Sequence, residues 1–413
     1  MMTAGWVRSL GGLFLSAFAC TVAPPATPAN SAAPSPSAVA EITAEVPFRM
    51  VDDHILISAT LNRAVEVELI LDTGLGSPGI VIVNPEVAEQ LGLEYVTELP
   101  LGGGGEGDPR VASVAMGGTL TVGGLEFRDQ QVMVFSDEDL FVDLYADGMV
   151  GGTLFMYVVE IDYDRSVLNL YDEVSGDPSD WGHTFDLTFT FGIPVVEAEI
   201  SLTQGAPVPV RLIVDTGVND PLLLFSYSDE DLEFAGSTIE GAGRVLSEGL
   251  TGKMMGSTGR IPGLRLGPFA IDAVVASFPD EESMGPARQL GQNGMLGNEV
   301  LQRFAVVFDY GESRMFLKPN EQHDRSFEYN TAGLVMRGGR HACWVEDVIV
   351  GSPAEKAGIR AGDRIVAIDG RDIPDYTGAE ISRIFARLGT SIECTIERGR
   401  DRFRCSLTLE RLI

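Results

Sequence analysis

The chain has 413 residues, a formal net charge of −31 and 45% hydrophobic residues. This length is enough for two or three domains, and the hydrophobic content can supply packed cores. The negative charge argues against a nucleic-acid partner and against charge-driven binding to an anionic membrane, since both require clustered Lys and Arg. An excess of acidic residues of this kind is expected of a solvated protein surface.

The N-terminal segment, as far as Ala40, is expected to be an export signal followed by a tether. Arg8 is the only charge before Glu41, and the apolar segment 10–19 is too short to span a membrane. We therefore expect a signal peptide over 1–19 and an Ala/Pro/Ser-rich linker over 20–40. The letters LSAFAC also resemble a bacterial lipobox, in which Cys20 would carry a lipid. Periplasmic secretion and lipid anchoring through Cys20 both stay open.

Two segments of the remaining chain recur in the same order. VELILDTG (67–74) returns as VRLIVDTG (210–217), and DGMVGG (147–152) returns as NGMLGN (293–298). The interval between the two Asp-Thr-Gly sequences is nearly the same as the interval between the two Gly-Met sequences. This spacing indicates a duplicated domain, with one copy over 41–180 and the second over 181–322.

Each copy is rich in short β-branched runs broken by Gly, Asn and Asp, which predicts a mostly β fold. One short helix is expected at 85–91, with Asn84 as its N-cap, Pro85 in its first turn and Gly92 at its end. A further short helix is expected after each Gly-Met sequence, at 153–157 and at 298–304.

An Asp-Thr-Gly after an apolar run, followed about 80 residues later by two apolar residues and a Gly, resembles one lobe of a retropepsin-like aspartic peptidase. Gly151 follows Asp72 at nearly the same interval as Gly297 follows Asp215. The resemblance covers both copies and implies two β-barrel lobes in a single chain. It implies that Asp72 and Asp215 are the catalytic pair. The supporting residues that it implies are Thr73, Gly74, Thr216, Gly217, Gly151 and Gly297.

Peptide hydrolysis requires one group that takes a proton from water and another that gives a proton. Two carboxyl groups a few ångströms apart can do both, because like charges this close cannot both ionise and one proton is shared. The four His residues are scattered and no His-Glu-x-x-His occurs, so neither a metal nor a cofactor is expected.

Two features near the motifs bear on activity. The glycine-rich stretches 99–118 and 249–263 occupy the position of a flap, a mobile hairpin that closes over substrate. Many relatives have Ala followed by Ser or Thr after the Asp-Thr-Gly. This chain has Leu75-Gly76 and Val218-Asn219 instead, with Ser77 or Asn219 as the nearest polar substitutes.

The C-terminal part, 323–413, resembles a PDZ domain of the circularly permuted bacterial type, on the letters of residues 345–373. The resemblance implies that a peptide C-terminus binds to backbone N–H groups of a loop while the peptide adds a strand. The loop residues that it implies are Gly333, Leu334, Val335 and Met336. A helix at 378–388 would flank the groove, and a groove used only for docking within the chain is the alternative.

Cys394 and Cys405 flank a turn at Gly399-Arg400 and are expected to lie opposite each other on a hairpin. A cross-strand disulfide and two thiols that fill the core are both open.

These patterns together predict an exported aspartic endopeptidase with protein or peptide substrates and a PDZ domain for C-terminal peptides. The alternatives are a catalytically inactive scaffold with the same fold, and a peptidase that processes only itself or one partner.

Overall fold

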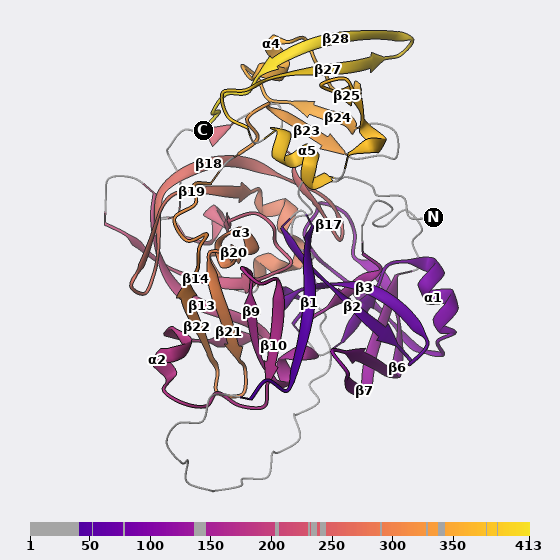
Figure 1. Cartoon of the computed structure of the whole chain (residues 1–413), viewed down its shortest axis with the longest axis vertical. Coiled ribbons are helices and arrows are strands. Elements are labelled where there is room, and N and C mark those ends of the chain that lie inside the picture. Colours follow the sequence, from indigo (N-terminus) through magenta and orange to yellow (C-terminus); the bar gives the residue numbers. More distant parts are fainter. Residues whose placement is uncertain are drawn as a thin grey trace, which may run out of the picture.

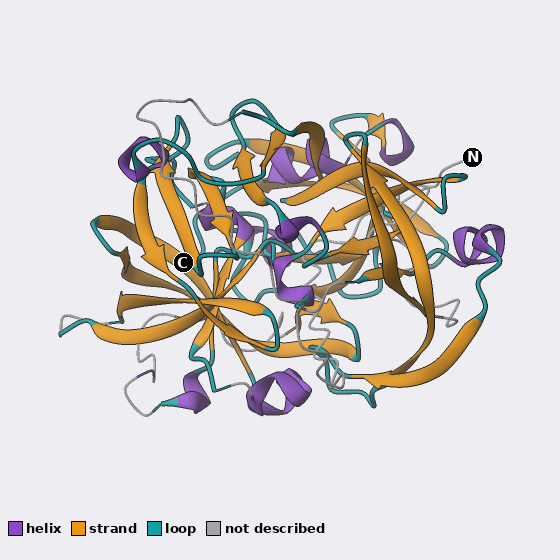
Figure 2. Cartoon of the chain, turned by 90° about the horizontal axis from the view of Figure 1, so that it is seen from below, coloured by secondary structure: helices purple, strands orange, loops and turns teal. Residues whose placement is uncertain are grey.

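A computed structural model of the chain describes residues 41–51, 53–76, 79–135, 146–202, 206–229, 232, 238–239, 245–289, 291–327, 329–337, 343–376, 378–385 and 387–413. The expected signal peptide, the linker, Cys20 and Ser77 lie outside these residues. Strands make up most of what is described, and the helices are short (Figure 2). None of the described helices has both the length and the apolar character needed to cross a bilayer.

Among its described residues, the first copy, called lobe 1 below, contains ten strands. They are β1 (Ala44–Val51), β2 (His54–Leu61), β3 (Val65–Leu71), β4 (Ile80–Ile82), β5 (Tyr95–Leu101), β6 (Arg110–Val122), β7 (Leu125–Phe135), β8 (Gly148–Val150), β9 (Val158–Asp162) and β10 (Val167–Tyr171), with the helix α1 (Pro85–Leu91) and 3-10 turns at Thr73–Leu75 and Leu154–Met156. The structure confirms the expected helix at 85–91, together with its N-cap and its end. Asn84 accepts a hydrogen bond from the Glu86 N–H at 3.0 Å, and Gly92 ends the helix at φ 54°.

The second copy, called lobe 2, repeats this series. Its elements are α2 (Pro178–Trp181), β11 (His183–Asp186), β12 (Thr188–Thr190), β13 (Ile193–Ser201), β14 (Val208–Asp215), β15 (Leu222–Leu224), β16 (Thr238–Ile239), β17 (Val245–Gly249), β18 (Gly252–Leu266), β19 (Phe269–Pro279), β20 (Gly294–Gly297), α3 (Asn298–Leu301), β21 (Phe304–Asp309) and β22 (Arg314–Pro319), with 3-10 turns at Ser226–Ser228 and Glu281–Gln289. The helices expected at 153–157 and 298–304 are a 3-10 turn and the four-residue α3.

Matching strand pairs place the two motifs equivalently. In lobe 1, β3 runs parallel to β8, with Leu71 opposite Val150. In lobe 2, β14 runs parallel to β20, with Asp215 opposite Gly297. Each of these second strands also pairs antiparallel with the strand that follows the Asp-Thr-Gly, β4 or β15. The duplicated sequence therefore produces duplicated strand pairing.

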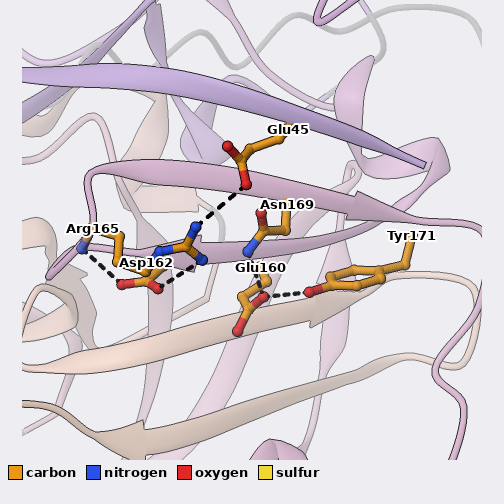
Figure 3. Close-up of polar contacts among 6 residues, drawn as sticks. All are labelled: Glu45, Glu160, Asp162, Arg165, Asn169 and Tyr171. Carbon is orange, nitrogen blue, oxygen red and sulfur yellow. Dashed lines mark hydrogen bonds and ion pairs between the residues drawn. The ribbon is translucent and has the colours of Figure 1, made fainter. Parts of the chain in front are cut away.

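A sheet shared by the lobes joins them. Strand β9 of lobe 1 pairs antiparallel with β21 of lobe 2, and Glu160 lies opposite Val307. In Figure 3, Asn169 and Tyr171 of β10 both donate to the Glu160 carboxylate, at 2.8 and 2.6 Å. The same figure shows Arg165 between Glu45 and Asp162. The large apolar core contains residues of both lobes, so they pack as one body.

The C-terminal domain has its own sheet and its own apolar core. Its elements are β23 (Leu334–Arg337), β24 (Cys343–Val348), α4 (Pro353–Lys356), β25 (Arg364–Ile368), β26 (Arg371–Asp372), a 3-10 turn (Ile373–Asp375), α5 (Gly378–Phe385), β27 (Ser391–Arg398) and β28 (Asp401–Thr408). Cys394 and Cys405 lie opposite each other across β27 and β28, as expected, and both are free thiols.

Strand β18 of lobe 2 contacts the C-terminal domain, which lies above it in Figure 1. The Arg260 guanidinium donates to the backbone carbonyls of Phe327, at 3.1 Å, and Ile413, at 3.3 Å. Lys253, near the start of β18, pairs with Glu346 of β24 at 3.5 Å. The strand that leads out of the lobe 2 flap thus also supports the C-terminal domain.

Candidate active site

The two aspartates lie together where the lobes meet. Asp72 follows β3 and Asp215 ends β14, and their side chains are 1% and 0% exposed. Each carboxyl group packs against the glycine of the opposite motif, Asp72 against Gly217 and Asp215 against Gly74. Two strand ends that are far apart in sequence therefore form one pair of carboxyl groups, each supplied by a different lobe.

Four hydrogen bonds cross the boundary beside this pair. The Thr73 hydroxyl donates to the Val214 carbonyl at 2.7 Å and accepts from the Thr216 N–H at 3.0 Å. In the symmetric arrangement, the Thr216 hydroxyl donates to the Leu71 carbonyl at 2.7 Å and accepts from the Thr73 N–H at 3.1 Å. Each hydroxyl thus satisfies two buried backbone groups, and the two loops are fixed relative to each other.

The glycines of the motifs leave room for the carboxyl groups. A Cβ atom on Gly74 would lie 2.1 Å from Asp215 Oδ2, and one on Gly217 would lie 2.5 Å from Asp72 Cγ. Gly151 and Gly297 pack beneath the loops, where a Cβ atom would lie 2.7 Å from Leu75 Cβ and 1.9 Å from the Asp220 carbonyl oxygen. No side chain fits at these four positions unless the loops move.

Burial and mutual repulsion set the protonation of the pair. Burial is the largest effect on both groups. It raises the pKa of Asp72 well above its usual value, with repulsion and a hydrogen bond from Asp215 adding to the rise. It raises the pKa of Asp215 to about 6, although hydrogen bonds from the Gly217 N–H, from Asp72 and from the Gly74 and Val218 N–H groups oppose it. The pair therefore keeps one proton, on Asp72, at pH values above about 6, where Asp215 is ionised.

The residues after each Asp-Thr-Gly do not supply a side-chain hydroxyl to the pair. Leu75 and Val218 are buried, 3% and 0% exposed, and their side chains pack in apolar clusters. Their N–H groups donate to the main-chain carbonyls of Asp72 and Asp215 respectively, both at 3.4 Å. Asn219 is not among the groups that dominate the pKa of either aspartate. The Gly217 N–H, at 2.8 Å from Asp215 Oδ1, is a backbone donor to the pair.

The two glycine-rich stretches contact each other. The Thr251 hydroxyl lies 2.9 to 3.3 Å from the carbonyl oxygens of Gly103, Gly104 and Gly105. The Gly107 N–H donates to the Thr251 carbonyl at 2.7 Å, and the Thr251 N–H donates to the Gly104 carbonyl at 3.0 Å. We call this set of hydrogen bonds the flap latch. It joins the two glycine-rich stretches, one from each lobe.

The sequence motifs did not identify two tyrosines that occupy equivalent positions in the two lobes. Tyr163 follows β9 and Tyr310 follows β21. The Tyr163 hydroxyl donates to Asn298 Oδ1 at 2.5 Å, in the residue after Gly297. The residue after Gly151 is Gly152, which offers no side chain, and the buried Tyr310 hydroxyl has no partner among the described residues. Aligning IDYDRS with FDYGES would have identified the pair.

A second polar cluster lies where α3 meets lobe 1. Asn298 Nδ2 donates to the Asp53 carbonyl at 2.6 Å, and Gln302 Nε2 donates to Asp53 Oδ1 at 3.2 Å. Burial raises the pKa of Glu299 to about 8; Asp53 and Asp220 add repulsion, and Arg303 acts in the opposite direction. Among the described residues, no group of His, Cys, Asp and Glu is placed to bind a metal ion.

The expected peptide-binding residues form the outer edge of the C-terminal sheet. Leu334, Val335 and Met336 belong to β23, which pairs only with β24 among the described strands, so its other edge faces no strand. The N–H groups of Gly333 and Leu334 both donate to Asn330 Oδ1 at 3.0 Å. These two N–H groups therefore have an acceptor within the chain.

Lobe 1 and the C-terminal domain are each similar to a known domain family. The family model described as aspartyl protease matches residues 57–154, and the one described as PDZ domain matches residues 344–398. A curated relative, Serine protease Do-like HtrA of Bacillus subtilis, is 29% identical over 152 residues, which is 36% of this chain and 31% of that protein. The chain thus covers less than a third of that relative. The aspartic proteinase of Irpex lacteus aligns with a TM-score of 0.42 and 15% identity, over 67% of this chain and 97% of that chain.

Proposed function

We propose that the chain is an exported aspartic endopeptidase whose catalytic pair is Asp72 and Asp215. One observation carries the proposal: the two buried carboxyl groups meet at the lobe boundary, each against the glycine of the opposite Asp-Thr-Gly. Burying two carboxyl groups costs stability, so the pair is not explained by a contribution to the fold. The arrangement suits two groups that share one proton.

In the proposed reaction the ionised carboxylate takes a proton from a water molecule, whose oxygen attacks the peptide carbonyl carbon. The protonated carboxyl gives its proton to the carbonyl oxygen, forming a neutral gem-diol. Collapse of this intermediate breaks the C–N bond, and the leaving amine takes the proton that came from water. A gem-diol hydroxyl returns its proton to the other carboxylate as the carboxylic acid product forms, so the pair again holds one proton. The flap latch would open to admit the peptide and close to exclude bulk water.

The test is cleavage of an unstructured protein by the chain from residue 41 onward, across pH 3 to 8. Asp72→Asn and Asp215→Asn are expected to lower the rate by about 10³-fold or more, since each removes a proton-transfer group. Circular dichroism of each variant controls for folding. Activity that survives both substitutions would refute the assignment.

A non-catalytic scaffold is the second candidate, and the closed flap latch favours it because both aspartates are inaccessible. An inactive parent chain that stays folded across the pH range would support the scaffold.

Export is tested separately by fractionation of a bacterial host that expresses the full chain. Labelling by a fatty acid that Cys20→Ser abolishes would show lipid anchoring.

We further propose that the PDZ domain binds the C-termini of protein substrates or partners along β23. Fluorescence anisotropy with a library of C-terminal peptides tests this, and amidated copies should bind more weakly because they lack the carboxylate. Equal binding of free and amidated peptides would argue for docking within the chain instead.

A further inference from the structure

His54 is a buried imidazole at the lobe boundary that the sequence patterns did not single out. It is the first residue of β2, is 2% exposed, and begins a strand whose other inward residues are apolar. Its Nε2 lies 2.9 Å from the backbone carbonyl oxygen of Gly217, in the other lobe. Because a carbonyl only accepts, Nε2 carries a proton. Burial lowers the pKa of His54 to about 4, against the effect of this carbonyl, so the ring is neutral at higher pH.

The carbonyl that His54 contacts belongs to a glycine that also touches the catalytic pair. The Gly217 N–H donates to Asp215 Oδ1 at 2.8 Å. The Val218 N–H, which shares the peptide unit of the Gly217 carbonyl, donates to the main-chain carbonyl of Asp215 at 3.4 Å. A trans peptide is planar, with its C=O and N–H pointing in opposite directions. A donor on the Gly217 carbonyl therefore fixes this peptide plane, and with it the turn that directs the Gly217 N–H at the carboxylate.

The duplicated position in lobe 2 lacks this interaction. Ile193 is the first residue of β13 as His54 is the first of β2, and each of these strands pairs with the strand that leads into an Asp-Thr-Gly. Ile193 packs on the loop of the other lobe at Gly76, where a Cβ atom would lie 2.9 Å from Ile193 Cγ1. At these two equivalent positions, His54 thus gives the Asp215 loop a hydrogen-bond donor, whereas Ile193 gives the Asp72 loop an apolar side chain.

We propose that His54 is a positioning residue that orients the Gly217–Val218 peptide and so makes Asp215, rather than Asp72, the carboxylate that takes the proton from water. The inference rests on the proposed function. The other ionisable groups around this contact are Asp53, next to His54 in the chain, Asp220, two residues after Val218, and Tyr310, whose pKa both aspartates raise. All three stay unchanged in the variants below.

The experiment compares His54→Leu with His54→Gln, whose amide can still donate to the carbonyl, and with Ile193→Leu as the matched substitution on the other loop. His54→Leu is expected to lower kcat about tenfold with little change in KM, since one orienting hydrogen bond is lost. It should also move the acidic limb of kcat/KM to higher pH, because the Asp215 carboxylate is less stabilised. His54→Gln should restore most of the rate, and Ile193→Leu should match the parent.

A parent-like rate and pH profile for His54→Leu, or an equal loss in His54→Gln, would overturn the inference.

Two measurements do not depend on activity. Nitrogen-15 NMR of the parent should show His54 as the neutral Nε2–H tautomer, assigned by its absence in His54→Gln, and an Nδ1–H tautomer would overturn the inference. Carbon-13 NMR of the carboxyl groups should show the lower apparent pKa of the pair rising in His54→Leu. If these hold while the parent cleaves nothing, the proposed function fails and the positioning role stands. If His54→Leu does not fold, His54→Asn, whose amide is too short to reach Gly217, replaces it.

Discussion

Thr73 and Thr216 exchange hydrogen bonds across the lobe boundary, so that each hydroxyl is both donor and acceptor to the backbone of the opposite lobe. The lobes are thereby joined directly beside the carboxyl pair. A small shift of one lobe would break these bonds before it separated Asp72 from Asp215.

The first prediction removes one of these hydroxyls. Thr73→Val keeps the side-chain shape but leaves the Val214 carbonyl and the Thr216 N–H without their partner. We expect the free energy of unfolding to fall by about 2 to 4 kcal/mol, since each unsatisfied buried group costs roughly 1–3 kcal/mol. Urea denaturation measures the change. Thr73→Ser, which keeps the hydroxyl, is the control, and an equal loss in both variants would contradict the explanation.

The second prediction concerns space beside the carboxyl groups. Gly74→Ala would place a Cβ atom 2.1 Å from Asp215 Oδ2, so the carboxyl group must move. We expect kcat/KM to fall by about 10²-fold or more, because a displacement of about 1 Å misaligns the reacting groups. Gly311→Ala is the matched control, since its Cβ atom would lie at an ordinary 3.6 Å from Asp309 Oδ1. Comparable activity of the two variants would argue against the close approach.

The third prediction separates the two related tyrosines. Tyr163→Phe should lower the free energy of unfolding by about 1–3 kcal/mol, because Asn298 Oδ1 loses its buried donor. Tyr310→Phe removes a hydroxyl that has no partner among the described residues, so it should leave stability unchanged or raise it. Thermal and urea unfolding of both variants give the comparison. Equal destabilisation would show that Tyr310 has a partner after all.

The fourth prediction is a dependence on pH. The pKa of Glu299 is about 8 in the folded chain and 4.5 ordinarily, so the folded chain keeps a proton that the unfolded chain releases between these values. The stability from this protonated group is present below pH 4.5 and is lost as the pH rises toward 8. Glu299→Gln keeps a neutral side chain, so its stability relative to the parent should grow with pH, by roughly 2–4 kcal/mol in total. A difference that stays constant from pH 4.5 to 8 would contradict the assignment.

The fifth prediction opens the flap latch. Thr251→Val removes the hydroxyl that contacts three glycine carbonyls of lobe 1. Hydrogen exchange at the Gly105 and Gly107 amides should speed up by about tenfold, since local opening becomes easier. Exchange mass spectrometry of peptides that cover 99–118 measures this, with Thr251→Ser as the control. Unchanged exchange would mean that the backbone bonds alone hold the latch.

The sequence alone determined the parts that depend on local chemistry and on repetition. The mostly β fold and the capped helix at 85–91 follow from residue types and their spacing, because caps and turns are set within a few residues. The duplicated Asp-Thr-Gly predicted that Asp72 and Asp215 would be equivalent, since equal sequences fold into equal strand pairs.

Only the tertiary structure decided how the copies differ where they meet. His54 and Ile193, or Asn298 and Gly152, take equivalent places in the repeat, yet their roles depend on which atoms of the other lobe they contact. Contacts between residues that are far apart in sequence depend on how the two barrels pack, and no local pattern records that packing. The flap latch and the buried state of the carboxyl pair have the same origin.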